Sequence, residues 1–214
     1  MSVDKVFWPA PYQRELEARV NTVDGNQITL DRTIIFAFSG GQQSDDGTIG
    51  GRPVLAAEKR GREIYYTLAD GHGLKAGDGV RLTIDWPLRY RLMKLHFAAE
   101  LALELVYRNY GHPERIGANI TADKARLDFR WEGSIASIIP DLQAQMDRLI
   151  AEDHPIRSDF SDPAAEQRYW EIEGFARVAC GGTHLQRTGE IGPVRLKRNN
   201  PGKGKERLEI FLKD

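Results

Sequence analysis

The sequence predicts an α+β protein in two parts, a small β-barrel domain over residues 1–87 followed by a two-layer α/β domain over residues 88–214. Two observations carry this prediction. The first part consists of short alternating segments separated by glycine turns, which is typical of a small barrel or sandwich. The second part begins with one long helical pattern and then mixes helices with strands. A chain of 214 residues is long enough for two such domains, each with a buried core.

The first part is expected to consist of short strands. Asp24-Gly25 lies between the first two of them and is a typical hairpin turn. The expected strands are residues 16–20, 28–30, 33–38, 63–68 and 80–84. Short strands joined by glycine-containing turns indicate a small barrel or sandwich.

The strongest helical pattern runs from about residue 88 to residue 110, with apolar side chains recurring every three or four positions. Asp85 precedes it and is a suitable N-cap, because a carboxylate accepts hydrogen bonds from the first backbone N–H groups of a helix. Gly111 follows it and suits the left-handed conformation that ends many helices. The pattern therefore predicts a long helix with defined ends.

Two more helices and several strands are expected in the second part. One helix begins near Pro140, and the other has Asp162 as its N-cap, Pro163 at its first position and Gly174 at its end. The expected strands are residues 126–131, 175–179, 194–198 and 207–212. Helices and strands mixed in this order indicate an α+β arrangement.

Charge is balanced over the whole chain but segregated along it. Thirty Lys and Arg residues against 31 Asp and Glu give a net charge of −1, which argues against a general nucleic-acid binder. Residues 141–173 are rich in acids, whereas basic residues gather further along. The basic residues are Arg195, Lys197, Arg198, Lys203, Lys205 and Arg207. Such a segment suits phosphate groups and could orient a polyanion, although an ordinary solvated hairpin is an equally good interpretation.

The sequence predicts neither a membrane segment nor a secreted protein. Mean hydropathy is −0.48, and the most apolar run, residues 97–106, is interrupted by Glu100 and Glu104. The N-terminus carries Asp4 and Lys5 and no apolar stretch of the kind found in signal peptides. We therefore expect a cytoplasmic protein without a membrane partner.

The single cysteine, Cys180, excludes an intrachain disulfide and directs attention to metal binding or reactivity. It begins the sequence Cys-Gly-Gly-Thr-His, which ends at His184. Two glycines between the thiol and the imidazole let the backbone fold tightly enough for both to reach one ion. The alternative is a buried structural cysteine beside a surface histidine.

A second pair of metal-ligand residue types lies on the expected long helix. His96 and Glu100 are four residues apart, so both side chains lie on one face of the helix, one turn apart. Most such pairs are ordinary surface pairs, so the spacing alone does not decide. Together with Cys180 and His184, however, they make a set suited to tetrahedral zinc, or a three-ligand set with an open position.

A polar, glycine-rich segment, residues 39–49, lies in the expected barrel and has the sequence SGGQQSDDGTI. It lacks the lysine of a phosphate-binding P-loop and the spacing of a dinucleotide fingerprint, which disfavours nucleotide binding. The side chains of Gln42, Ser44 and Asp45 are candidates to line a small polar pocket. The alternative is an ordinary polar turn between strands.

These motifs together resemble the AlaX proteins, free-standing relatives of the editing domain of alanyl-tRNA synthetase. The resemblance rests on Gly-Gly-Gln-x-Ser-Asp-x-Gly-Thr-Ile at residues 40–49, on the helical motif of His96, and on Cys-x3-His followed by Thr-Gly-Glu-Ile-Gly-Pro at residues 180–193. It covers nearly the whole chain and is closest in kind to the medium-length members. It implies an editing domain of the threonyl- and alanyl-tRNA synthetase type that holds zinc. The implied reaction is trans-editing, the hydrolysis of the ester of seryl-tRNA(Ala), with glycyl-tRNA(Ala) as a second candidate substrate.

The resemblance also implies a set of metal ligands. His96, Cys180 and His184 match the family's zinc positions, whereas Glu100 stands where the family has its second histidine. A carboxylate is an accepted zinc ligand, so the first expectation is that Glu100 substitutes for that histidine. Two alternatives stay open: Glu100 acts as a base without binding the metal, or the site does not hold metal.

These positions motivate a hypothesis for the roles of polar and basic residues. Gln42, Ser44 and Asp45 are the candidate catalytic residues, because a hydroxyl or amide group in the pocket can distinguish serine from alanine. Asn119 and Thr121 are weaker candidates. The residues expected to contact the acceptor end of misacylated tRNA(Ala) are Arg195, Lys197, Arg198, Lys203 and Lys205, with help from Arg89, Arg91 and Lys94.

Two other functions stay open at this point. A non-catalytic tRNA-binding module would keep the fold and lose the metal at position 100. A zinc hydrolase of small esters or amides would make the basic segment incidental. Because the chain is too short for an additional activation domain, no ATP binding is expected. The oligomeric state stays open.

Overall fold

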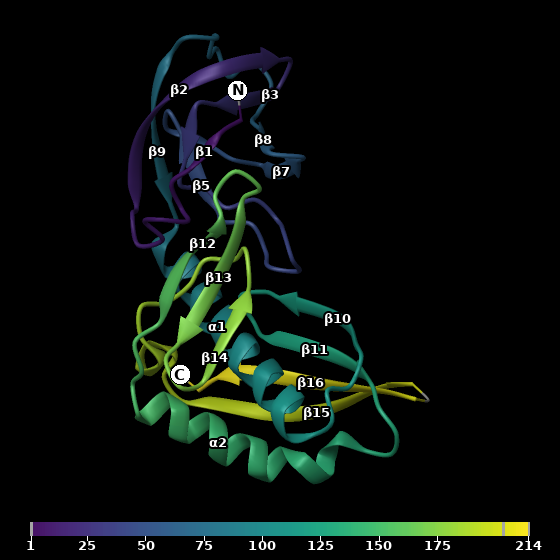
Figure 1. The fold of residues 1–214 in the computed structure, drawn as a ribbon. Coiled ribbons are helices and arrows are strands. Elements are labelled where there is room, and N and C mark those ends of the chain that lie inside the picture. The colour runs from purple at the N-terminus through teal and green to yellow at the C-terminus, as the bar shows by residue number, and fades with distance from the viewer. Residues whose placement is uncertain (1, 203, 214) are drawn as a thin grey trace. The chain divides into compact units, whose positions relative to one another are not determined.

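The computed structural model describes residues 2–202 and 204–213, and the protein is a mixed α+β structure (Figure 1). Its helices are α1 (Trp86–Asn109), α2 (Ile139–Ala151) and the 3-10 helices η1 (Ile135–Ile138) and η2 (Thr188–Ile191). The chain divides into two compact units. Unit 1 comprises Met1–Ser39 and Gln43–Tyr90, and unit 2 comprises Gly40–Gln42 and Arg91–Asp214. This division falls inside α1. The boundary expected from the sequence, after residue 87, also lies inside this helix.

Unit 1 is built around a curled antiparallel sheet that forms a half-barrel (Figure 1). Its strand order is β6-β5-β9-β2-β3-β8-β7. The strands are β2 (Glu15–Asp24), β3 (Gln27–Leu30), β5 (Gly47–Ile49), β6 (Arg52–Pro53), β7 (Ala56–Arg60), β8 (Glu63–Thr67) and β9 (Gly79–Ile84). Two further short strands, β1 (Asp4–Lys5) and β4 (Arg32–Thr33), pair in parallel and form a separate two-stranded sheet. The expected turn is present: Asp24 pairs with Gln27, and Gly25 has a φ of 59°.

The expected strand over residues 33–38 is wrong beyond Thr33, where β4 ends. The backbone that follows is buried but bonds to side chains instead of a neighbouring strand. The Arg89 guanidinium donates to the Ile34 carbonyl at 2.6 Å, and the Phe36 N–H donates to the Asp45 carboxylate at 2.6 Å. Buried backbone groups need partners of some kind, and here polar side chains supply most of them, while the Phe36 carbonyl accepts from the Asp45 N–H at 3.0 Å. The apolar pattern of the sequence does not reveal whether the backbone of this segment bonds to a neighbouring strand or to side chains.

Helix α1 confirms the strongest sequence prediction. The Asp85 carboxylate accepts a hydrogen bond from the Leu88 N–H at 2.9 Å and so caps the helix. Past the C-terminus, Gly111 adopts a φ of 77°. Most of the helix is buried, Phe97 and Leu101 completely. Among the described residues, no helix is both long enough and apolar enough to cross a membrane.

Unit 2 combines α2 and most of α1 with two antiparallel sheets. The larger sheet has the order β10-β11-β16-β15 and the smaller the order β12-β13-β14. Their strands are β10 (Arg115–Ile120), β11 (Ala125–Arg130), β12 (Arg157–Asp162), β13 (Gln167–Ile172), β14 (Ala176–Ala179), β15 (Val194–Gly202) and β16 (Lys205–Leu212). One face of the larger sheet belongs to the core, where Leu127, Phe129 and Leu208 are at most 2% exposed.

Helix α2 lies alongside β15, the edge strand of the larger sheet (Figure 1). The Gln143 side chain accepts a hydrogen bond from the Leu196 N–H at 2.8 Å and donates to the Val194 carbonyl at 3.1 Å. The amide thus occupies backbone groups that an exposed edge strand would present to another chain. This helix begins one residue before Pro140, as the sequence predicts.

The expected helix over residues 162–174 is wrong, because this segment is a β-hairpin. Asp162 does accept from the Ala165 N–H, at 2.9 Å, but in a tight turn in which Glu166 has a φ of 55°. The strands β12 and β13 then pair on either side of the turn. An aspartate followed by proline starts turns as readily as helices. Trp170 and Ile172 are both buried on β13 and lie two residues apart, the spacing of one face of a strand.

Candidate metal centre

Three side chains of unit 2 converge on one point. His96 comes from the buried middle of α1, whereas Cys180 and His184 come from the loop that follows β14. Nε2 of each imidazole lies 3.2 Å from Sγ of Cys180, and potential ligand atoms of all three residues lie within 4.8 Å of one another. Donors that lie ~2.0 and ~2.3 Å from one tetrahedral ion are about 3.5 Å apart. The three side chains are therefore spaced as ligands of a single metal ion.

The loop from Cys180 to His184 depends on glycine at one position. A Cβ atom on Gly182 would lie 2.4 Å from Nε2 of His96, so any side chain there would displace the imidazole. The Gly182 carbonyl accepts a hydrogen bond at 3.0 Å from the buried guanidinium of Arg168 on β13. Strand β13 thus fixes the loop from one side, while the absence of a side chain lets His96 approach it from the other.

The two imidazoles are held differently. Nδ1 of His184 shares a hydrogen bond of 2.8 Å with the Ser158 hydroxyl on β12, which leaves Nε2 directed at Cys180. This is how metal-binding histidines are usually oriented, by a second group on the other ring nitrogen. His96 is only 5% exposed, yet its Nδ1 has no hydrogen-bond partner within the described part of the chain. The ring is placed by α1, by the contact of its Nε2 with Cys180 and by stacking on the ring of His184 at 5.4 Å between centroids.

The electrostatics of the cluster suit a bound cation. Burial lowers the pKa of both imidazoles, and for His184 the neighbouring His96 and Arg168 lower it further, so both rings are neutral donors. Burial also raises the pKa of the Cys180 thiol, and the Glu100 carboxylate adds to this effect. A metal ion reverses that preference for the neutral thiol, because a coordinating thiol is deprotonated. Two neutral imidazoles and one thiolate are a donor set that zinc accepts.

Glu100 lies one turn along α1 from His96 but does not belong to the three-residue group. Its Oε2 accepts a hydrogen bond of 2.8 Å from the indole N–H of Trp170, a residue buried on β13. The carboxylate is near enough to Cys180 to act on its pKa. Ligation of the metal by Glu100 therefore stays a prediction, as does the alternative that it acts as a base.

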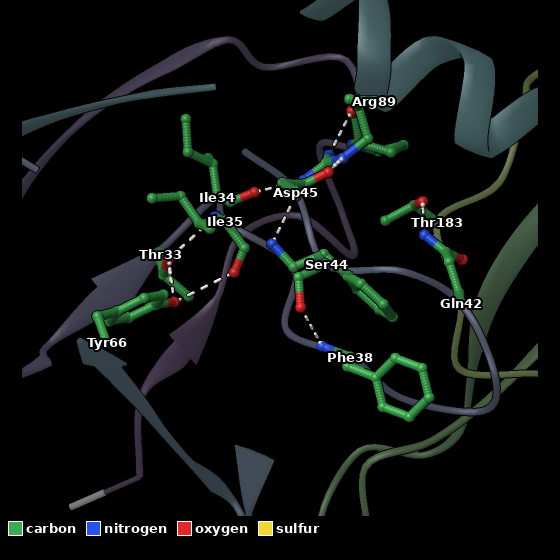
Figure 2. Close-up of polar contacts among 12 residues, drawn as sticks. Thr33, Ile34, Ile35, Phe38, Gln42, Ser44, Asp45, Tyr66, Arg89 and Thr183 are labelled. Atoms are coloured by element: carbon green, nitrogen blue, oxygen red, sulfur yellow. Dashed lines mark hydrogen bonds and ion pairs between the residues drawn. The ribbon is translucent and has the colours of Figure 1, made fainter. Parts of the chain in front are cut away.

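Gln42 is the one residue of the glycine motif that reaches the neighbourhood of the cluster within unit 2. Its Nε2 donates to the Thr183 hydroxyl at 3.1 Å, inside the loop that carries the ligands (Figure 2). Its Oε1 is buried and has no partner among the described residues, and it would lie 3.1 Å from a Cβ on Gly182. Gly41, at a φ of 85°, allows this approach, because a Cβ there would lie 2.5 Å from the Ala118 carbonyl oxygen.

Ser44 and Asp45 belong to unit 1, and both bond to nearby groups. The Ser44 hydroxyl accepts from the Phe38 N–H at 2.8 Å, and the fully buried Asp45 carboxylate forms an ion pair with Arg89 (Figure 2). A catalytic role for Ser44 and Asp45 stays a prediction. The expected phosphate contact of Arg89 is wrong, because this guanidinium is 0% exposed and bonded to Asp45.

The two weaker pocket candidates and the two other basic residues expected to help bind tRNA all lie in unit 2. Asn119 donates to the Gly41 carbonyl at 3.4 Å, and the Thr121 hydroxyl donates to the Lys124 carbonyl at 3.2 Å. Arg91 donates to the Ala122 carbonyl at 2.6 Å, and Lys94 is half-buried on α1.

The basic segment occupies β15, β16 and the turn between them. Arg195 and Lys197 are exposed on β15, whereas Arg198 points to the opposite side of that strand and binds the buried Glu206 carboxylate at 2.5 and 2.6 Å. Lys205 is exposed at the start of β16, and Lys203 lies outside the described residues. Contacts of these residues with tRNA stay a prediction.

Sequence reasoning missed several groups that support the cluster. Ser158, Arg168 and Trp170 lie on β12 and β13, the hairpin that was expected to be a helix. Assigning that segment as strands by its alternating pattern would have placed Arg168 and Trp170 on one face, toward the core.

The chain is similar in sequence to known proteins over nearly its whole length. Residues 169–209 match the family described as the threonyl and alanyl tRNA synthetase second additional domain. The chain is 32% identical to the alanyl-tRNA editing protein AlaX-M of Pyrococcus horikoshii over 97% of both chains, and 34% identical to that of Methanosarcina acetivorans over 95% of this chain and 96% of the relative. It is also 32% identical to a quarter (25%) of the alanine–tRNA ligase of Methanococcus maripaludis. The chain belongs to the AlaX-M family of alanyl-tRNA editing proteins.

Proposed function

We propose that this protein is a zinc-dependent deacylase that hydrolyses the ester bond of seryl-tRNA(Ala), with glycyl-tRNA(Ala) as a second substrate. The observation that carries the proposal is the convergence of His96, Cys180 and His184 beside the unpartnered amide oxygen of Gln42. The editing activity named for the relatives supports the reaction class. In this proposal unit 2 is the editing domain and the curled sheet of unit 1 is the small barrel domain of the family.

The ligand cluster would hold the ion through Nε2 of both imidazoles and Sγ of Cys180. Zinc, when bound, supplies a Lewis acid. The chain contributes a fixed and partly dry environment: His96 and His184 are at most 5% exposed, and Ser158 holds the ring of His184 in one orientation. No side chain at Gly182 fills the space beside His96.

Gln42 would select the aminoacyl group. Its Nε2 is committed to Thr183, so Oε1 is the atom left to accept a hydrogen bond from a substrate hydroxyl or amino group. Serine brings a hydroxyl donor, whereas alanine brings a methyl group and leaves a buried polar atom unpaired. Sites built to bond a hydroxyl reject analogues that lack it for this reason. Ser44 and Asp45 would act indirectly, by shaping the loop that carries Gln42.

Glu100 would be the fourth ligand, held toward the ion by the indole of Trp170. The hydrogen bond to Oε2 leaves Oε1 available for coordination. An anionic ligand in place of a neutral imidazole lowers the net charge of the site and makes a bound water more basic.

The direct test is hydrolysis of seryl-, glycyl- and alanyl-tRNA(Ala) by protein of assayed zinc content, before chelation, after chelation and after zinc is restored. We expect zinc-dependent loss of serine with alanine spared. A folded, zinc-loaded protein that binds tRNA without deacylating it would instead favour the non-catalytic module. Zinc-dependent cleavage of simple esters with no preference for tRNA would favour a small-molecule hydrolase.

A second test addresses Glu100. Glu100→Gln should weaken zinc binding and change the visible absorption of the cobalt-substituted protein, while Glu100→His should restore tight binding with a shifted spectrum. Glu104→Gln, one turn further along the same helix, is the matched control and should change neither property. If Glu100→Gln keeps the cobalt spectrum but lowers the deacylation rate, Glu100 acts as a base and not as a ligand.

A further inference from the structure

Positive charge gathers on the outward face of the larger sheet of unit 2, the face opposite the buried one. Strand register places Arg126 of β11, Glu209 of β16 and Lys197 of β15 in one row across the sheet. The neighbouring row places Arg207 of β16 between Asp128 and Asn199. Side chains two residues apart along a strand share a face, so Arg195 and Phe211 belong to this face as well.

The two acids of this face lie beneath the cations. The side chains of Glu209 and Asp128 are 6% and 14% exposed, and they bind Lys124 and Arg207 at 2.6 Å. The cations above them are more exposed, 38% for the side chain of Lys124 and 21% for that of Arg207. The acids therefore hold the cationic layer in place while the cations face outward.

The exposed edge of this face carries charge that no acid neutralises. Arg195 and Lys197 are exposed on β15, and neither forms an ion pair within the described part of the chain. The guanidinium of Arg195, on β15, lies 5.2 Å from the ring centroid of Phe211. The ammonium group of Lys124, just before β11, lies 5.7 Å from the same centroid. A half-buried aromatic ring between two cations offers stacking and charge together.

We propose that this surface, formed by Lys124, Arg126, Arg195, Lys197, Arg207 and Phe211, binds the sugar–phosphate backbone of the RNA substrate. The inference rests on the proposed function for the identity of the RNA. Five cations against two shielded carboxylates present a net positive layer, which is complementary to phosphate. Contacts of cationic side chains with phosphates fix the position of a nucleic acid but carry no sequence information, so this surface would position the RNA without reading its sequence. Three of these residues, Arg195, Lys197 and Arg207, belong to the basic segment of the sequence, whereas pairing of β11 with β16 brings Arg126 to them and Lys124 precedes β11.

The experiment measures binding of fluorescently labelled, uncharged tRNA(Ala) by anisotropy over a range of salt concentrations. The Arg195→Gln/Lys197→Gln variant should bind more weakly, and the slope of log K against log salt should become shallower by about 2, because each lost phosphate contact removes about one counterion. Both side chains are exposed, so the variant should keep the melting temperature of the parent. The charge-preserving Arg195→Lys/Lys197→Arg variant should restore the slope.

The matched control is Arg148→Gln/Arg157→Gln, which removes the same charge from exposed positions on α2 and β12. The proposal is overturned if control and test variants lose equal affinity and slope, or if the test variant keeps the parental slope. It is also overturned if polyglutamate of equal charge competes as well as RNA, which would indicate an acidic protein partner. A parent that shows the expected slopes but deacylates no seryl-tRNA(Ala) refutes the proposed function and leaves the RNA surface standing.

Discussion

Each unit contains a cluster of buried polar side chains, and the two clusters differ in how completely they are satisfied. In unit 1 the cluster is the ion pair of Arg89 and Asp45. Arg89 donates to Asp45, to the Pro11 carbonyl at 3.0 Å and to the Ile34 carbonyl at 2.6 Å, and Asp45 accepts from the Phe36 N–H as well. All three guanidinium nitrogens of Arg89 and both carboxylate oxygens of Asp45 therefore have partners within the protein.

The cluster of unit 2 is equally buried but incomplete. His96 and Gln42 are 5% and 0% exposed, yet Nδ1 of His96 and Oε1 of Gln42 lack partners among the described residues. Leaving a buried polar atom unpaired costs about 1–3 kcal/mol. Such a cost is expected where a ligand completes the bonding. The satisfied cluster has the bonding of a structural ion pair, and the unsatisfied one has the open bonding that the proposed metal ion and substrate would complete.

The largest effect should follow from breaking the satisfied pair. Asp45→Ala leaves the Arg89 guanidinium buried without its counter-ion and should lower the free energy of unfolding by about 3–5 kcal/mol. The measurement is denaturant unfolding, together with the metal affinity of the folded protein. Because the pair belongs to unit 1 and the three candidate ligands belong to unit 2, the metal affinity should stay at the parental value.

The double variant Asp45→Ala/Arg89→Met is the control for this interpretation. Removing both charges leaves no unpaired ion, so it should be more stable than Asp45→Ala alone. Loss of zinc from folded Asp45→Ala protein would contradict the division into a structural and a functional cluster.

The next largest effect concerns the approach of the ligand loop to His96. Gly182→Ala places a Cβ 2.4 Å from Nε2 of His96 and should weaken zinc binding by about 100-fold, measured by competition with a chelator. Gly181→Ala is the matched control, since a Cβ at that position would meet no atom within 4 Å. Equal zinc affinities for the two variants would show that His96 does not ligate the metal in this geometry.

Local rules predict the ends of α1 and the Asp24-Gly25 turn because the deciding interactions lie within a few residues. Asp85 caps its own helix, and Gly111 ends it. The same rules fail for residues 162–174, where Asp162 caps a turn inside a hairpin. Whether such a segment becomes helix or strand depends on its neighbours, here β12 and β14 pairing with β13. That choice is made by tertiary packing, which local propensity does not encode.

The candidate site shows the same limit. The spacing from Cys180 to His184 identifies two donors, and the structure adds His96 from a segment more than 80 residues away, as the resemblance implies. The groups that orient the donors, such as Ser158, follow only from strand register. The glycine motif divides between the units: Gln42 bonds within unit 2, whereas Ser44 and Asp45 bond within unit 1. No local pattern distinguishes these three polar residues.

A smaller effect should follow from loosening one ligand. Ser158→Ala removes the hydrogen bond to Nδ1 of His184 and frees the ring to rotate, which should weaken zinc binding by about 10-fold. Unfolding should change little, since Ser158 is only half-buried. Ser161→Ala is the control. It removes a hydroxyl from the same strand, one that donates to the Gln167 carbonyl and not to a histidine. If the two serine variants bind zinc alike, the ring of His184 is fixed by packing and not by the hydroxyl.

The smallest effect tests a pair that lies between the two extremes, Glu206 with Arg198. Here the carboxylate is buried, with 2% of its side chain exposed, but the guanidinium is 34% exposed and reaches water. Arg198 lowers the pKa of Glu206 below its ordinary value of about 4.5. The pair therefore stabilises the folded state above that value, and the stabilisation is lost as the pH falls through the lowered pKa. Glu206→Gln should be less stable than the parent at pH 7, by less than Asp45→Ala, and the difference should shrink by pH 3.5 in denaturant unfolding. A difference that does not change with pH would show that Glu206 acts through packing and not through its charge. An ion pair with one solvent-exposed partner would then contribute little to stability, unlike the fully buried pair of Asp45 and Arg89.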